Sequence, residues 1–257
     1  MKESVIVKKL ILTASALALF ACATSGTPGT PVSNHIKTLP NQGSLVILGV
    51  SARLSTRANE IAAAKEMAAR KAAMYHGLTA SFEEVQFIGA GFFDYVHDTH
   101  SWVDYDRQLE WHMEKLSFDP KRDLFRDNNG NVFIRFIYPA AFPGRISYQF
   151  GTRADGRPDW IRQPPGEIHG FIAGVGRSAR LFRFADTFSR SFEAAALAIA
   201  AKISTEIETR DSAGHYRTEV EFRRQSIASM TNFLILETWI DPQTRAVYTL
   251  AIARPEN

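Results

Sequence analysis

The sequence predicts an α+β fold built from two tandem strand-helix-three-strand units, each with one helix packed on a mostly antiparallel sheet. Two observations predict it. The segment 46–53 returns as 171–178, and an alanine-rich stretch with helical spacing of its apolar residues follows each copy. After each helix the apolar period changes from 3.6 to 2, which is typical of strands with one solvated face.

Residues 1–21 are expected to be a lipoprotein signal peptide. Lys8 and Lys9 precede an apolar run over 10–23. As a helix this run spans about 21 Å, which is short of the roughly 30 Å hydrocarbon core of a membrane. The motif Leu19-Phe20-Ala21-Cys22 is similar to the lipobox of bacterial lipoproteins. That resemblance implies cleavage before Cys22, acylation of its sulfur and attachment to a membrane through the lipid anchor.

Two alternatives follow from the residues around Cys22. The triplet 21–23 also fits ordinary signal peptidase, which would release a soluble protein beginning at Thr24. If the cysteine is acylated instead, Ala23 stands where an inner-membrane lipoprotein usually has aspartate, so we expect an outer-membrane address. Residues 22–43 contain three prolines after Cys22 and lack a hydrophobic period, so they are expected to be a flexible tether.

The first α+β unit is expected over 44–139. Its helix carries one apolar stripe, and its hairpin is predicted from strands over 109–118 and 132–138. A connection rich in proline and glycine follows over 140–169. The helix stripe comprises Ile61, Ala64, Ala68, Ala72 and Tyr75.

The second unit is expected over 170–257. Its helix stripe runs from Phe188 to Ile207, a strand is predicted over 216–223, and a hairpin joins 233–240 to 246–252 through the turn 241–245. Because each helix must bury its stripe, either the two sheets merge into one body or the units dock.

Several packing and turn residues of the second unit resemble the LPP-twenty lipoprotein domain family. They are Trp160, the pair Pro164-Pro165, the step 174–176, the alanine-rich helix and the hairpin 239–248. The resemblance covers about 159–255 and, more weakly, 44–139, which lacks the tryptophan and the double proline. It implies a bacterial outer-membrane-associated lipoprotein with a small α+β domain, in a family with some members that look like parts of cell-envelope or flagellar assemblies.

Composition excludes several kinds of chemistry. The net charge is 30 − 27 = +3, and +2 of it lies in the first nine residues, so nucleic acid is not an expected partner. One cysteine permits neither a disulfide framework nor a cysteine-built zinc site. The step 174–176 lacks the third glycine of a dinucleotide loop, and His97, His100 and His112 lack the spacing of a helical metal pair. We therefore predict no catalytic residue, metal or cofactor.

Arginine is in excess between positions 145 and 190, with eight arginines against four carboxylates. Guanidinium groups bind phosphate and carboxylate groups through paired N–H donors, so Arg177, Arg180 and Arg183 are candidate binding residues. The sequence therefore leaves two non-enzymatic functions open, beside a hydrolase for which no set of catalytic residues can be assembled from the sequence. One is a lipid-anchored, non-enzymatic structural or assembly component, periplasmic or surface facing, that acts through protein partners or self-association. The alternative is a binding module for an anionic envelope polymer such as peptidoglycan or lipopolysaccharide.

Overall fold

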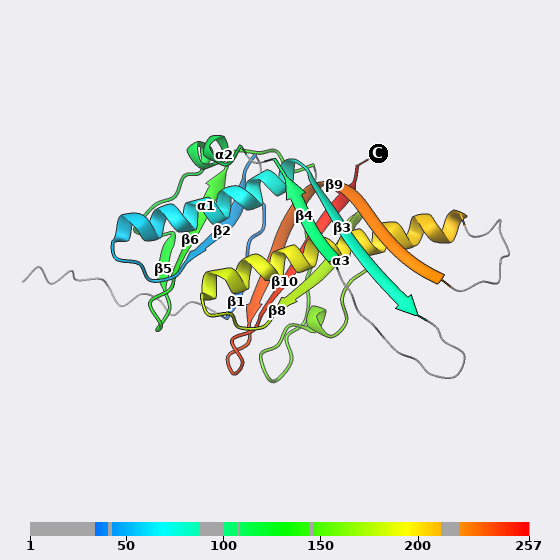
Figure 1. Cartoon of the computed structure of the whole chain (residues 1–257). Helices are drawn as coiled ribbons and strands as arrows, with labels where there is room; N and C mark the ends of the chain where they lie inside the picture. Colours follow the sequence, from blue (N-terminus) through cyan, green and yellow to red (C-terminus); the bar gives the residue numbers. More distant parts are fainter. Residues whose placement is uncertain are drawn as a thin grey trace, which may run out of the picture.

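The computed structural model describes residues 34–40, 43–87, 100–106, 108–143, 146–211 and 221–256. Two antiparallel sheets and three α-helices form an α+β fold in this part of the chain, which confirms the predicted class (Figure 1). The larger sheet has the order β4-β3-β9-β10-β8-β7, with β1 also paired to β9, and the smaller sheet has the order β2-β6-β5.

The bounds of the elements are as follows. The larger sheet contains β1 (His35–Lys37), β3 (Leu78–Phe87), β4 (His100–Tyr105), β7 (Glu167–Ile168), β8 (Phe171–Ser178), β9 (Glu221–Ile240) and β10 (Val247–Pro255). The smaller sheet contains β2 (Leu45–Ser51), β5 (Leu124–Arg126) and β6 (Val132–Tyr138). The helices are α1 (Arg57–His76), α2 (Leu109–Lys115) and α3 (Phe184–Asp211), with a 3-10 turn η1 (Asp159–Ile161).

Helix α1 packs on the smaller sheet and α3 on the larger one, each through its predicted stripe. Ala64, Ala68 and Ala72 of α1 are fully buried, and the apolar side chains of α3 from Phe188 to Ile203 form the core beneath it. The two helices also meet each other, since Nζ of Lys71 lies 5.1 Å from the centre of the Phe192 ring. The two stripes therefore contribute to one continuous body.

The strand-helix repeat is visible in two glycine crossings. A Cβ on Gly49 would lie 2.1 Å from the backbone oxygen of Ala64, and a Cβ on Gly176 would lie 2.0 Å from that of Ser191. Both pairs are related by the same offset, since 176 − 49 = 127 and 191 − 64 = 127. The predicted alignment of 46–53 with 171–178 has an offset of 125 and is wrong by two residues. The closest approach of helix to strand sets the register, and only a residue without a side chain fits there.

The strands that follow α1 do not stay in a sheet of their own. β3 pairs with the first half of β9, from Leu78 opposite Met230 to Phe87 opposite Glu221. A hairpin from the first predicted unit thus extends the sheet on which α3 packs. The two predicted units therefore share one sheet.

Two predicted strands have a different structure. Residues 109–115 form helix α2, because Leu109, His112, Met113 and Leu116 point inward at helical spacing. Residues 216–220 lie outside the described residues, and from 221 the chain runs as the single strand β9 through to Ile240. Asn232 has a positive φ of 55° within this strand, where the pairing with β10 shifts register, so an irregularity stands where two strands were predicted.

The tether and the connection are shorter than predicted. β1 lies within the predicted tether 22–43, yet it pairs with β9 and buries Ile36, so residues 34–40 belong to the folded body. Within the predicted connection 140–169, Trp160 is fully buried. Backbone pairing and aromatic burial fasten both segments despite their proline and glycine content. The predicted signal peptide lies outside the described residues.

Candidate functional site: an arginine-lined cleft

Two loops that begin with the same short sequence lie at the start of the two long helices. The tetrapeptide Ser-Ala-Arg-Leu occurs at 51–54, where β2 leads into α1, and again at 178–181, where β8 leads into α3. The copies are related by the offset of 127 that relates the glycine crossings. We call residues 52–56 the β2–α1 loop and residues 179–183 the β8–α3 loop.

The two loops are held by equivalent hydrogen bonds. The amide of Leu54 donates to Oε1 of Glu60 at 3.2 Å, and the amide of Leu181 donates to Oγ1 of Thr187 at 3.0 Å. In each case a side chain in the first turn of the helix accepts from the residue six positions earlier. These hydrogen bonds fix the amides of Leu54 and Leu181. The preceding residues, Arg53 and Arg180, therefore occupy equivalent positions in the two loops.

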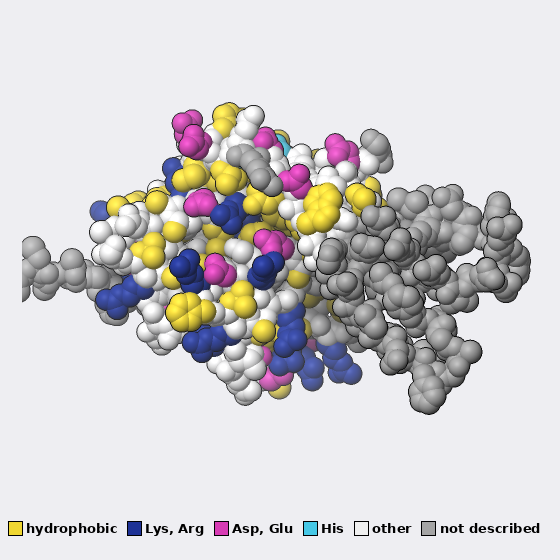
Figure 2. Space-filling model, viewed as in Figure 1, with side chains coloured by type: hydrophobic (Ala, Val, Ile, Leu, Met, Phe, Trp, Pro, Cys, Tyr) yellow, Lys and Arg dark blue, Asp and Glu magenta, His cyan; other side chains and the backbone are white. Residues whose placement is uncertain are grey.

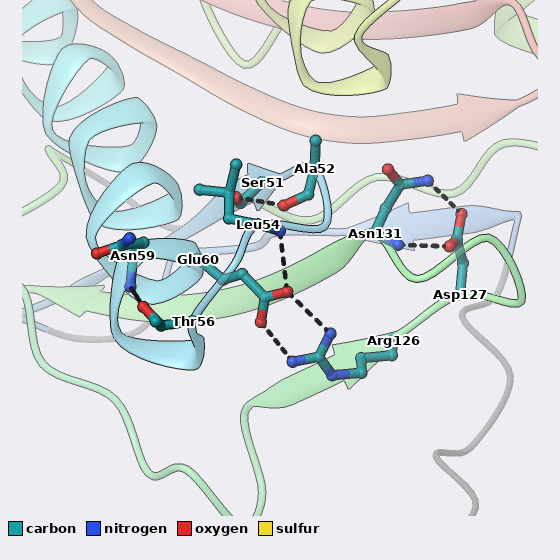
Figure 3. Close-up of polar contacts among 9 residues, drawn as sticks. All are labelled: Ser51, Ala52, Leu54, Thr56, Asn59, Glu60, Arg126, Asp127 and Asn131. Carbon is teal, nitrogen blue, oxygen red and sulfur yellow. Dashed lines mark hydrogen bonds and ion pairs between the residues drawn. The ribbon is translucent and has the colours of Figure 1, made fainter.

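Glu60 is the centre of the polar contacts around the β2–α1 loop (Figure 3). Its carboxylate is buried and accepts from Nη2 of Arg126 at 2.5 Å and from Nη1 at 3.3 Å, in addition to the Leu54 amide. The hydrogen bonds from Arg126 lower the pKa of the Glu60 carboxyl from its usual value, and burial, which would raise it, is outweighed. Glu60 thus links the loop to β5 as a carboxylate.

Replacing Glu60 by Gln should destabilise the protein in a pH-dependent way. A group whose pKa is lowered on folding adds stability above its unfolded pKa, which is about 4.3 for Glu. We expect Glu60→Gln to lower the free energy of unfolding by about 1–2 kcal/mol at pH 7, and the difference from wild type to shrink as pH falls through the folded-state pKa. Denaturant unfolding at neutral and acidic pH measures this, and a difference that does not change with pH would contradict it.

A cleft of about 810 Å³ opens between the two loops, the middle of α1 and the beginning of α3. Two carboxylates, those of Glu66 and Asp186, line this cleft. Five arginines also line it, namely Arg53, Arg70, Arg180, Arg183 and Arg245. In the view of Figure 2, dark-blue basic side chains lie among magenta acidic and yellow apolar ones around the start of α3. The lining therefore carries an excess of positive charge.

The five arginines differ in their partners. Nη2 of Arg70 lies 2.6 Å from Oε1 of Glu66, and Nη2 of Arg245 lies 2.9 Å from Oδ2 of Asp127. None of the ion pairs found within the described ranges includes Arg53, Arg180 or Arg183, and these three side chains are exposed. The pair between Arg245 and Asp127 joins the β9–β10 turn to the β5–β6 turn at the cleft. The fixed parts of the lining are thus neutralised, while three guanidinium groups face solvent.

The structure divides the predicted binding residues between two places. Arg180 and Arg183 line the cleft, but Arg177 lies outside it, 5.7 Å from the centre of the Tyr248 ring, in a separate groove with Arg190. The sequence reasoning missed Arg53 and Arg245, which reach the cleft from elements far apart in the chain. The repeated tetrapeptide is the signal that would have found Arg53. Cys22 lies outside the described residues.

Within the described part of the chain, no three His, Cys, Asp or Glu side chains are grouped so that they could hold a metal ion, and His112 is buried with Nδ1 2.9 Å from the Tyr138 hydroxyl. None of the helices in this part is both long and apolar enough to cross a membrane. The cleft therefore supplies cationic hydrogen-bond donors, which is the chemistry of an anion site.

Comparison with protein-family models, with curated proteins and with solved structures gives no match to this chain.

Proposed function

We propose that this chain is a lipid-anchored protein of the outer membrane that acts without catalysis, by binding an anionic envelope polymer such as peptidoglycan or lipopolysaccharide. The convergence of Arg53, Arg180 and Arg183 on one cleft carries the proposal. These guanidinium groups have no ion pair with any of the described residues, and they lie on two adjacent loops, so they match a ligand that presents several phosphates or carboxylates. Of the two non-enzymatic functions that the sequence leaves open, this arrangement favours the binding module.

The lipid anchor is supported by sequence features alone. Cys22 lies near the end of the apolar run that follows Lys8 and Lys9, and it is the single cysteine of the chain. The resemblance of the second half to the LPP-twenty lipoprotein domain family, carried by Trp160 and the hairpin 239–248, points to the same address. A body tethered beside an envelope polymer needs little affinity, because the tether keeps its local concentration high.

Acylation of Cys22 is tested by metabolic labelling with palmitate. We expect label on the wild-type protein in membrane fractions and complete loss of label in Cys22→Ala, because the cysteine sulfur and the new amino terminus are the sites of acylation. A control variant, Ser15→Ala, leaves the apolar run and Cys22 intact and should be labelled normally. An unlabelled, soluble wild type beginning at Thr24 would contradict the anchor.

Binding at the cleft is tested by retention on peptidoglycan sacculi and on immobilised lipopolysaccharide. Removing three charge-assisted contacts in Arg53→Ala/Arg180→Ala/Arg183→Ala should weaken retention at least about tenfold at physiological salt, equivalent to about 1.4 kcal/mol. The control Arg153→Ala/Arg162→Ala/Arg177→Ala removes the same charge from exposed positions outside the cleft lining. Equal losses in both triple variants would mean that net charge, and not the cleft, governs retention.

A second candidate, an assembly component that acts through protein contacts, is favoured by an apolar pair on the larger sheet. Trp102 of β4 and Ile227 of β9 are exposed, and both are register partners of Ser81 on β3 between them. Exposed apolar neighbours of this kind often mark contact surfaces. Retention that survives the cleft triple variant but is lost in Trp102→Ala/Ile227→Ser would favour this candidate.

A further inference from the structure

We infer that the arginine-lined cleft docks on the anionic headgroup surface of the membrane that holds the lipid anchor, with Leu54, Leu181 and Phe182 entering the lipid layer. The inference rests on the proposed function and names the lipid surface, rather than peptidoglycan, as the source of the anions. Three observations carry it: the apolar residues beside the arginines, the place where the chain leaves the body, and the charge of the cleft.

The two loops expose apolar side chains next to their arginines. Phe182 is 103 % exposed, and Leu54 and Leu181 are 43 % and 39 % exposed. Each leucine directly follows a cleft arginine, and Phe182 lies between Arg180 and Arg183. A soluble polyanion offers little to these side chains, whereas the boundary between headgroups and acyl chains accepts both apolar and cationic groups.

The tether leaves the body at the same end as the loops. The amide of Ile240 donates to the backbone oxygen of Asn34 at 2.7 Å, so the first described residue lies at the end of β9. Val247 pairs with both Ile240 and Ser178, which places that end beside the β8–α3 loop. The ion pair between Arg245 and Asp127 places the turn before β6 at the same end of the body. Val132, the first residue of β6, pairs with Ser51, and the β2–α1 loop follows Ser51 directly.

The remaining tether is short. The chain from Cys22 to Asn34 reaches at most about 40 Å when fully extended. An anchor at Cys22 therefore holds the end of the body that bears the loops within a short distance of the lipid surface. Cationic side chains near an anionic leaflet are attracted over about a Debye length, and the tether keeps the cleft in reach of it.

The test places a fluorescent probe at Phe182 in the acylated full chain. In that protein Cys22 is blocked by its lipid, so Phe182→Cys provides the free thiol for an environment-sensitive NBD label. The labelled protein is incorporated through its own anchor into vesicles of phosphatidylcholine, with or without phosphatidylglycerol. The matched control is Ile227→Cys, an exposed apolar position that lies thirteen residues before Ile240 on β9.

We expect the probe at position 182 to shift to shorter emission wavelength and to be quenched by nitroxide-labelled acyl chains in vesicles with phosphatidylglycerol. The control probe at 227 should show neither effect. Adding Arg53→Ala/Arg180→Ala/Arg183→Ala should abolish the shift while the protein stays anchored. A probe at 182 that behaves the same in both lipid compositions, or a shift that follows protein density and not lipid charge, as contact between copies would produce, overturns the inference.

The outcomes separate this inference from the proposed function. If the probe stays in water while the cleft triple variant still loses retention on peptidoglycan or lipopolysaccharide, membrane docking is wrong and anion binding stands. If that variant keeps its retention while the probe enters the lipid in a charge-independent way, both proposals fail.

Discussion

Replacing Gly176 by Ala is expected to destabilise the protein by about 3 kcal/mol, since overpacking at a rigid contact costs about 1–3 kcal/mol and occasionally more. The added Cβ would lie 2.0 Å from the backbone oxygen of Ser191 and 2.3 Å from the amide nitrogen of Ala195. Both atoms belong to the backbone of α3, so no side-chain rotation relieves the clash. The helix must move away from β8, and the start of α3 with the β8–α3 loop moves with it.

Gly49→Ala should behave in the same way, because its Cβ would meet the backbone oxygen of Ala64 at 2.1 Å. Gly166→Ala is the matched control, since nothing lies within 4 Å of its Cβ and its φ is not in the left-handed region. That control should be neutral or slightly stabilising, because alanine restricts the unfolded chain. Thermal and denaturant unfolding measure the difference. If Gly176→Ala is as stable as Gly166→Ala, the close crossing that defines the repeat is wrong.

Replacing Glu237 by Ala is expected to cost about 2–4 kcal/mol, because it removes hydrogen bonds to a charged group and leaves a buried donor without its acceptor. Glu237 lies in β9 and is fully buried. Its Oε2 accepts from Nε1 of Trp160 at 2.6 Å and lies 2.5 Å from Nε2 of His35, while Nζ of Lys37 is 3.3 Å from Oε1. The variant would leave the indole N–H buried without this acceptor and release the two β1 side chains.

Glu237 contributes to stability in its ionised form. Burial alone would raise the pKa of Glu237, but the hydrogen bonds from His35 and Trp160 outweigh it and hold the pKa below its usual value. The carboxylate thus adds stability above the unfolded pKa of Glu, and this stability is lost as pH falls through the folded-state pKa.

Hydrogen exchange of the amides of β1 should rise in Glu237→Ala before the protein unfolds globally. Glu167→Ala, an exposed glutamate in β7 of the same sheet, should change neither stability nor exchange appreciably. A Glu237→Ala protein with wild-type stability would show that the buried cluster does not hold β1 in place.

The parts of the fold that depend on local spacing can be predicted from the order of the residues. The stripes of α1 and α3, the strands β2 and β8, and the hairpin of β9 and β10 through the turn 241–245 all lie where their apolar periods predict them. The buried face of a single helix or strand can be predicted from the spacing of the apolar residues within it. The α+β class follows from these elements and needs no knowledge of how they meet.

Local spacing failed where packing overrides it. The segment that forms α2 has alternating polarity as well as a helical stripe, and the body buries the helical one, with His112 and Leu116 inside. The predicted alignment of the two copies is wrong by two residues because it matched apolar residues, which are interchangeable, instead of Gly49 and Gly176, which make the close approaches to the helices. In both cases the contact that determines the structure is made with another helix or strand, far from the segment whose local pattern was used for the prediction.

The pairing of the strands and the meeting of the arginines follow from long-range contacts in the folded chain. β1 finds β9 about 200 residues away, and β3 joins the sheet of α3, through backbone hydrogen bonds that nearly any sequence can donate and accept. Arg53 and Arg180 lie 127 positions apart, and they line one cleft because two strand-helix pairs end at the same edge of the body. Side-chain periodicity reveals the local elements, whereas the cleft forms through long-range strand pairing, and the repeated tetrapeptide is its trace in the order of residues.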